Sequence, residues 1–311
     1  MSYARQVKKE VATIQSTIED DKAILYGYIK LKGEIGLSHD GVVLELSTTS
    51  NTITRKVAST LKKLYNANYE MYSKTLSKLS GQTLFVIRLK EGLKDILIDL
   101  DLSDDGILIN DEVSKAYDDY ASKVITGMFL AKGSINDPDK TKRYHLEIVC
   151  NNEYEANYII DGLASFDIYA KCILRDKGYV VYLKKSEAIG DFLKLIGAYN
   201  EMYKFEDARI KRDYNNIVNR MYNCDIANGE RSAKAATRQL AAIKKIEETI
   251  GYAALSPRLI GAVLLRTDYP YYTLSDLSEV CAEDTKYFDK PMSKSGISHC
   301  LKEIEDIASK L

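Results

Sequence analysis

Two stretches of nine residues decide the fold. They read Leu25-Tyr26-Gly27-Tyr28-Ile29-Lys30-Leu31-Lys32-Gly33 and Ile125-Thr126-Gly127-Met128-Phe129-Leu130-Ala131-Lys132-Gly133. Each stretch places one glycine inside an apolar helical segment and a second glycine six residues later, directly after a lysine. A glycine inside a helix lowers helix stability by about 1 kcal/mol relative to alanine. Its presence at the same position in both copies therefore indicates a structural role. We expect Gly27 and Gly127 to let two helices approach closely.

The repeated pattern resembles the LAGLIDADG motif of homing endonucleases, without its acid. In those enzymes the eighth position is Asp or Glu on each of two packed helices, and the pair holds the divalent metals that hydrolyse DNA. The corresponding residues here are Lys32 and Lys132. A lysine accepts no hydrogen bond and repels a cation, so we expect no metal site and no catalytic residue. The two lysines are either candidate DNA phosphate contacts or a solvated or salt-bridged pair.

The signals for secondary structure recur in the same order after each motif. In the first copy they predict strands at 33–37, 42–48, 69–75 and 83–89 and helices at 50–64 and 92–100. In the second copy they predict strands at 144–150, 168–175 and 179–185, with a helix after Asn152 and another over 186–199. The expected fold class is α+β, a duplicated αββαββα pseudo-dimer followed by an all-α helix-turn-helix domain. The expected domains are 1–105, 106–200, a helical Asn/Arg-rich linker over 201–250, and 251–311.

Composition limits the class of protein. The chain has 311 residues, 45% hydrophobic content and a formal net charge of -1, which is typical of a globular protein of two or three domains. A nucleic-acid partner must therefore be met by a local basic surface. The five cysteines form no CxxC pair, which argues against zinc and for reduced thiols in a cytosolic protein. No apolar run is long enough for a membrane span, and the first twenty residues do not resemble a signal peptide.

The acidic linker between the two copies has a partial match to a calcium-binding loop. Asp101, Ser103 and Asp105 occupy positions one, three and five, Gly106 position six, and Glu112 position twelve. Position nine is Ile109, however, and flanking helices are only weakly indicated. A solvated connection without metal is the favoured interpretation, and we expect no cofactor.

The segment from 200 to 229 is rich in asparagine and basic residues. These side chains are poor core residues, and they are the ones that reach base edges and phosphates. The candidate DNA contacts in it are Arg212, Asn219, Arg220, Asn223 and Asn228. An exposed polar helix without a ligand explains the same composition equally well. An Ala-rich amphipathic helix is predicted to follow from Ala233 to Ile250.

The last sixty residues predict three helices in the spacing of a helix-turn-helix module. They should cover Pro257 to Arg266, Thr273 to Cys281, and a third segment from Ser293 to about Ser309. In the third helix Ile297, Leu301, Ile304 and Ile307 would face the core. This leaves Ser293, Lys294, Ser295, Ser298, His299 and Lys302 as candidate DNA contacts. A three-helix protein-interaction domain would show the same periodicity.

Four motifs together resemble the WhiA family of bacterial transcription regulators over essentially the whole chain. They are residues 127–138 (GMFLAKGSINDP), 144–148 (YHLEI), 220–228 (RMYNCDIAN) and 293–299 (SKSGISH). The resemblance implies a sequence-specific DNA-binding protein linked to sporulation, cell division or gene regulation, with the helix-turn-helix as reader and the nuclease-like domain as a non-catalytic platform. In that pattern a basic residue commonly follows the histidine. Here it is Cys300, so we expect one phosphate contact fewer.

The sequence thus favours a transcription regulator that is not an enzyme. The alternative is a nucleoid-associated or cell-division-linked DNA-binding scaffold with low sequence preference, and an active endonuclease is disfavoured by the lysine pair. The expected partners are double-stranded DNA and, as a second class, other transcription regulators, with no membrane. The expected location is the cytoplasm, at the nucleoid.

Overall fold

The computed structural model describes residues 2–38, 41–76, 82–141, 143–176 and 178–311. Its contacts divide the chain into two compact units, an N-terminal unit (Met1–Arg212) and a C-terminal unit (Asp213–Leu311). Among the described residues, no helix combines the length and the apolar character that a membrane crossing requires.

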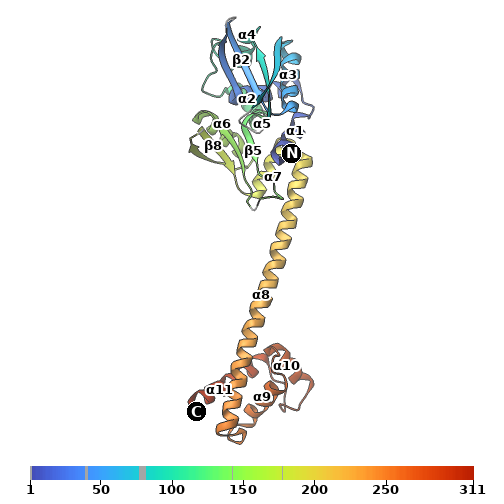
Figure 1. The fold of residues 1–311 in the computed structure, drawn as a ribbon, viewed down its shortest axis with the longest axis vertical. Helices are drawn as coiled ribbons and strands as arrows, with labels where there is room; N and C mark the ends of the chain where they lie inside the picture. Colours follow the sequence, from blue (N-terminus) through green and yellow to red (C-terminus); the bar gives the residue numbers. More distant parts are fainter. Residues whose placement is uncertain (1, 39–40, 77–81, 142, 177) are drawn as a thin grey trace. The chain divides into compact units, whose positions relative to one another are not determined.

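The first half of the N-terminal unit begins with a helix that the sequence patterns did not predict, α1 (Tyr3–Ala12). The predicted elements follow in order (Figure 1): α2 (Ile18–Lys32), β1 (Gly33–Ser38), β2 (Gly41–Thr48), α3 (Asn51–Tyr65), β3 (Tyr69–Leu76), β4 (Gln82–Leu89) and α4 (Leu93–Asp99). The four strands form one antiparallel sheet in the order β1-β2-β4-β3.

The second half repeats this arrangement. A short 3₁₀ helix, η1 (Lys115–Tyr120), leads into the elements α5 (Ala121–Lys132), β5 (Gly133–Ile135), β6 (Leu146–Cys150), α6 (Glu153–Ala164), β7 (Lys171–Arg175), β8 (Gly178–Leu183) and α7 (Ser186–Leu195). Its antiparallel sheet has the corresponding order β5-β6-β8-β7. The same strand order in both halves confirms the predicted duplication.

Two strands of the second half begin later than the sequence indicated. The predicted strand at 168–175 begins at Lys171, and the one at 144–150 begins at Leu146. At the first of these, Asp167 adopts the left-handed region (φ 61°), and the Ile168 amide donates to the Leu163 carbonyl at 3.0 Å. The chain there is still closing the end of α6, so the apolar Ile168 fills the core without joining a strand.

The two motif helices, α2 and α5, pack directly against each other in the centre of the N-terminal unit (Figure 1). A methyl group added at Gly27 would lie 2.1 Å from the carbonyl oxygen of Val124, and one added at Gly127 would lie 2.1 Å from that of Ile24. The backbones therefore touch, and only glycine fits at the crossing. The close helix packing expected from the two glycines is confirmed.

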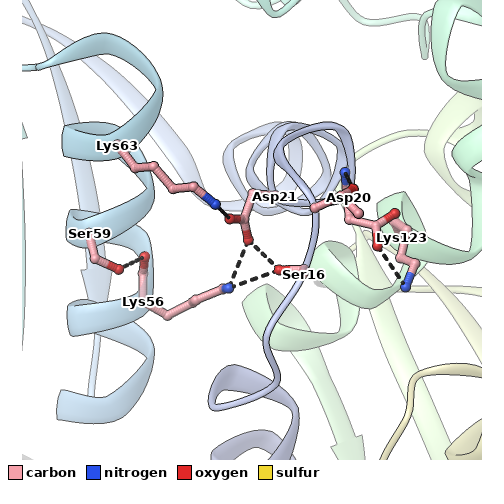
Figure 2. A network of polar contacts seen from close by, with 8 residues as sticks. Ser16, Asp20, Asp21, Lys56, Ser59, Lys63 and Lys123 are labelled. Atoms are coloured by element: carbon pink, nitrogen blue, oxygen red, sulfur yellow. Dashed lines mark hydrogen bonds and ion pairs between the residues drawn. The ribbon is translucent and has the colours of Figure 1, made fainter.

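A network around the buried Asp21 fixes the start of α2 (Figure 2). Lys56 and Lys63 of α3 each place an ammonium 2.8 Å from its carboxylate, and Ser16 donates a hydrogen bond to it. Beside it, Asp20 forms an ion pair with Lys123 of α5 at 3.3 Å. Burial would raise the pKa of Asp21, but the hydrogen bonds from the two lysines and the serine outweigh it and hold the pKa below its usual range. The network thus ties the first motif helix to its neighbours on both sides.

The connection between the two units is a single 51-residue helix, α8 (Tyr199–Thr249). The sequence indicated two helical stretches around Gly229, but that glycine lies within the helix and has no neighbouring atom that would hinder a side chain. The first residues of α8 pack on the N-terminal unit through Phe205 and Ala208, and its last turns belong to the core of the C-terminal unit through Ile243 and Ile246.

The C-terminal unit confirms the predicted three-helix module. After a short 3₁₀ turn, η2 (Tyr252–Ala254), come α9 (Pro257–Asp268), α10 (Leu274–Glu283) and α11 (Lys294–Lys310). Each helix begins behind a capping side chain. The Ser256 hydroxyl accepts from the Leu259 amide, Thr273 forms a capping box with Asp276, and the Ser293 hydroxyl accepts from the Gly296 amide at 3.2 Å.

Candidate nucleic-acid interface

The ends of the two motif helices carry lysines where a nuclease of this fold would carry carboxylates. Lys32 is the last residue of α2 and Lys132 the last of α5, and both side chains are half-buried. Burial lowers the pKa of Lys132, the Glu155 carboxylate opposes that shift, and the positive charge of Lys32 adds to it. The two ammonium groups are therefore close enough to repel each other, at the centre of the duplicated fold.

A hydrogen-bond chain holds Lys132 in place. Its ammonium donates to the side-chain oxygen of Asn151, whose amide nitrogen in turn donates to the Glu155 carboxylate at 3.1 Å. Glu155 is buried, and burial raises the pKa of its carboxyl although Asn151 and the two nearby lysines, Lys30 and Lys132, act in the opposite direction. Lys30 itself is buried, and its ammonium donates to the Glu112 carbonyl at 2.7 Å. This side of the site is an internal polar network.

Lys32, in contrast, opens onto a cavity of about 280 Å³ with two further cations, Arg5 and Lys8 of α1. The hydroxyl side chains of residues 47 to 50, at the end of β2 and before the first turn of α3, also line it. No acidic side chain is among the described residues that line it. Lys8 donates to the Leu130 carbonyl at 3.0 Å, and burial together with the charge of Lys32 lowers its pKa to about 7. Three cations, hydroxyl donors and no acid make this cavity suited to a phosphate group.

The sequence reasoning missed Arg5 and Lys8. A signal was present, because the two residues are three apart and so share one face of a helix. The residues around them carry no recognisable motif, however, and nothing in the sequence places α1 beside the end of α2.

The described residues contain no group of three or more His, Cys, Asp or Glu side chains placed to hold a metal ion. In the loop from Asp101 to Glu112, the protein itself uses the oxygens that a calcium ion would need. One Asp105 oxygen accepts from the Ser103 hydroxyl at 3.0 Å and from the Ile107 amide at 2.8 Å, and Asp101 accepts from the Ser114 hydroxyl. The carboxylates of this loop thus accept hydrogen bonds from the protein's own backbone and hydroxyl groups.

Several basic residues on or beside the two sheets already have acidic neighbours. Arg88 on β4 forms an ion pair with Glu45 on β2, Lys90 pairs with Glu70 at 3.4 Å, and Arg175 lies 3.7 Å from Glu147. A cation that already has an acidic neighbour attracts a phosphate less strongly, because the two charges largely cancel at longer range. The strands therefore offer less positive potential than their basic residues suggest.

Arg212 is engaged by the N-terminal unit's own backbone. Its guanidinium donates to the carbonyls of Pro138 and, at 2.7 Å, of Thr141, and it lies 4.5 Å above the ring of Tyr144. These contacts fix the loop of residues 136–141 against α8. Asn219, Arg220, Asn223 and Asn228 are exposed farther along α8, in a region where every side chain from 213 to 226 is exposed.

The six candidates on the third helix of the module lie where the sequence placed them. Ser293 caps α11, and Lys294, Ser295, Ser298, His299 and Lys302 are exposed over its first three turns. The residues between them, Ile297, Cys300 and Leu301, are fully buried. The expectation about Cys300 is therefore wrong: its side chain lies in the core, so a missing charge there removes no phosphate contact.

Three family models match successive parts of the chain. Residues 19–103 match the WhiA N-terminal LAGLIDADG-like domain, residues 121–215 the WhiA LAGLIDADG-like domain, and residues 218–308 the WhiA C-terminal HTH domain.

Proteins and a solved structure that match over the whole length of the chain belong to the same family. A protein of Pediococcus pentosaceus is 38% identical over all of this chain and 99% of its own length, and one of Enterococcus faecalis is 39% identical over all of this chain and 98% of its own. Both are named probable cell division protein WhiA. The crystal structure of full-length WhiA from Thermotoga maritima covers all of this chain and 99% of its own, with a TM-score of 0.58 at 23% identity. That likeness shows a shared fold.

Proposed function

The chain belongs to the WhiA family, and we propose that it is a sequence-specific DNA-binding transcription regulator whose duplicated domain is a platform without catalysis. The observation that carries this proposal is the two-sided character of α11. One side, with Ile297, Leu301 and Ile304, is buried in the module, and the other presents hydroxyls, an imidazole and two ammonium groups to solvent. An amphipathic helix that follows two others in the chain and exposes its polar side has the character of the recognition helix of a helix-turn-helix.

Within α11 the candidates divide by chemistry. Lys294 and Lys302, with the capping Ser293, would contact phosphates, which fixes the position of the module on the duplex. Ser295, Ser298 and His299 would reach base edges in the major groove, which provides discrimination between sequences. On α8 we propose Asn219 and Asn223 as further contacts, because they are four residues apart and share one exposed face. Arg220 and Asn228 lie on other faces of the same helix, and Arg212 is occupied by backbone carbonyls.

In the platform we propose that Lys32, together with Arg5 and Lys8, holds a DNA backbone phosphate in the 280 Å³ cavity. Lys132 would add to the positive potential from its position beside Asn151. Such contacts contribute affinity to every sequence and none to discrimination. The absence of carboxylates at positions 32 and 132 is what supports a platform without nuclease activity.

A DNA-binding scaffold with low sequence preference, linked to cell division, is the second candidate function. It is favoured by the name of the relatives, probable cell division protein, and by the cavity of Arg5, Lys8 and Lys32, which is suited to phosphate and not to bases. The two functions differ in the ratio of specific to non-specific affinity, which is ~10³ to 10⁷ for regulators.

The test is a salt titration of binding to a footprinted genomic site and to random duplex. Lys294→Ala should weaken both and reduce the slope of log affinity against log salt by about one. Lys310→Ala removes the same charge from the far end of α11 and should change neither. Ser298→Ala should weaken only the cognate duplex. Equal affinity of the parent protein for cognate and random DNA would favour the scaffold over the regulator.

A further inference from the structure

The middle of α8 exposes an apolar stripe that runs along one side of the helix. Ile210, Tyr214, Ile217 and Met221 are 64%, 66%, 55% and 63% exposed, and Cys224 is exposed as well. Asn228 continues the stripe, and its side-chain amide lies 3.5 Å from the Cys224 sulfur. Large apolar side chains that are exposed in a continuous row indicate an interaction surface. We call the row of Ile210, Tyr214, Ile217, Met221, Cys224 and Asn228 the α8 seam.

The spacing of the seam is that of a coiled coil. Its residues follow one another by four, three, four, three and four positions, which is the alternation of d and a positions in heptads. The asparagines proposed as DNA contacts, Asn219 and Asn223, lie on the opposite side of the helix, at f and c positions. The residues that bury α8 against the N-terminal unit, Phe205 and Ala208, also fall outside the a and d positions. None of the described residues covers the seam.

We propose that the α8 seam pairs with the same seam of a second copy of this chain, as a parallel two-stranded coiled coil. In that arrangement each seam residue meets its own counterpart. Asn228 at an a position would face Asn228 of the second copy, a pairing that costs stability but fixes register and favours two strands. The row of isoleucine, tyrosine and methionine before it would be removed from water on both helices.

The charges beside the seam agree with the parallel orientation. Arg220 is at a g position and Asp225 at the following e position, so each Arg220 would lie against Asp225 of the second copy, twice per dimer by symmetry. The preceding g and e positions are occupied by Asp213 and Val218, so no like charges meet there. An antiparallel pairing of the same seam would place Arg220 against Arg220 and would set Asn228 opposite the apolar Ile210. Both contacts are unfavourable, so the sequence of the seam selects one orientation.

The pairing would have a consequence for DNA recognition. All seam residues after Ile210 belong to the same compact unit as the three-helix module, and α8 ends within the core of the module. A parallel dimer would therefore deliver two modules to one DNA molecule, and the bound site should contain two half-sites. The pairing itself does not rest on the proposed function, since it follows from the seam alone.

Sedimentation of the full-length protein tests the pairing. Between about 1 and 100 µM the parent protein should pass from monomer to dimer. A variant with Ile217→Lys and Met221→Lys should raise the dissociation constant of the dimer at least about 100-fold, because four cations would meet in the seam. The matched control carries Asn219→Lys and Asn223→Lys, the same added charge on the outer side of the same turns, and should dimerise like the parent. All substituted residues are exposed, so folding should be unaffected, which circular dichroism checks.

Orientation is tested by mild copper-catalysed oxidation in a Cys172→Ser background, which leaves Cys224 as the only exposed cysteine among the described residues. Parallel pairing brings the two Cys224 sulfurs together at a d position and should yield a disulfide-linked dimer on non-reducing gels. In the antiparallel arrangement Cys224 would face Tyr214, and no disulfide-linked dimer would form. A protein that stays monomeric throughout the concentration range, a seam variant that still dimerises, or the absence of the Cys224 cross-link would each overturn the proposal.

Discussion

Replacement of Gly127 by alanine should destabilise the N-terminal unit, although alanine is the better helix former. The added methyl carbon would lie 2.1 Å from the Ile24 carbonyl oxygen and 2.9 Å from the Tyr28 nitrogen, whereas real contacts of this kind begin at about 3.0 Å. Both neighbours are backbone atoms, so no side-chain rotation relieves the clash. The helices α2 and α5 must instead separate by about 1 Å at their crossing, which disturbs the core on both sides.

The magnitude follows from two opposing effects. Overpacking usually costs about 1 to 3 kcal/mol and occasionally more, and because both neighbours here are backbone atoms we expect about 3 to 4 kcal/mol. The helix propensity of alanine returns about 1 kcal/mol. The net loss in free energy of unfolding is about 2 to 3 kcal/mol. For a unit of this size that lowers Tm by roughly 4 to 12 °C. Gly27→Ala should behave alike, because its methyl group would meet the Val124 carbonyl at the same 2.1 Å.

Two control substitutions make the same chemical change in other surroundings. At Gly162 in α6 the methyl group would be too close only to the end of the flexible Ile125 side chain, at 2.9 Å, and would make an ordinary contact with the Ala121 Cβ at 3.6 Å. At Gly229 in α8 it would meet nothing within 4 Å. Gly162→Ala should therefore change stability by less than about 1 kcal/mol, and Gly229→Ala should stabilise its helix by up to about 1 kcal/mol. Urea unfolding followed by circular dichroism and calorimetric Tm give the ranking. If the Tm of Gly127→Ala is equal to or higher than that of Gly162→Ala, the close crossing of α2 and α5 is refuted.

Three further predictions concern charge. The purified protein should not nick plasmid DNA with Mg²⁺, because Lys32 and Lys132 cannot ligate the metal; metal-dependent nicking that disappears when a nearby acid is changed would contradict this. Asp21→Asn should lower the free energy of unfolding by about 2 kcal/mol at neutral pH, less than for a fully buried pair because Lys63 is half exposed. Since the folded-state pKa of Asp21 is depressed below 3.8, its contribution is present above that pH and is lost as pH falls through the folded value, so parent and variant should converge in acid. Lys32→Ala should weaken cognate and random duplex by the same factor and leave Ser298-dependent discrimination intact; an effect confined to cognate DNA would make the platform a reader.

The fold was predictable because its decisive signals are local. The glycine-bearing helices, the alternating strands and the caps at Ser256, Thr273 and Ser293 each depend on a few neighbouring residues. The exposed face of α11 followed from the same periodicity. The starts of strands do not follow from the apolar pattern alone, since an apolar residue such as Ile168 fills the core equally well from a turn.

The surroundings of Lys32 depend on tertiary contacts that no local pattern encodes. The cavity brings α1 next to the end of α2, although the two cations of α1 are more than twenty positions away in the chain. Arg212 is an example of the opposite kind. Its basic side chain predicted a nucleic-acid contact, yet the carbonyls of a loop some seventy positions earlier satisfy it. Composition alone cannot distinguish a cation that is free for a ligand from one that holds a loop.

The exchange of carboxylates for lysines also changes what the ends of α2 and α5 require. Two carboxylates at these helix ends would need a cation. Two lysines need an anion, because burial and mutual repulsion both lower the pKa of Lys132. The protein satisfies one side internally, through Asn151 and the buried Glu155. On the other side Lys32 shares its cavity with two more cations and no described acid, and burial with the charge of Lys32 lowers the pKa of Lys8 to about 7. A phosphate that binds there would relieve the repulsion and raise that pKa, so affinity for DNA should increase as pH falls through 7 and should lose this dependence in Lys8→Met.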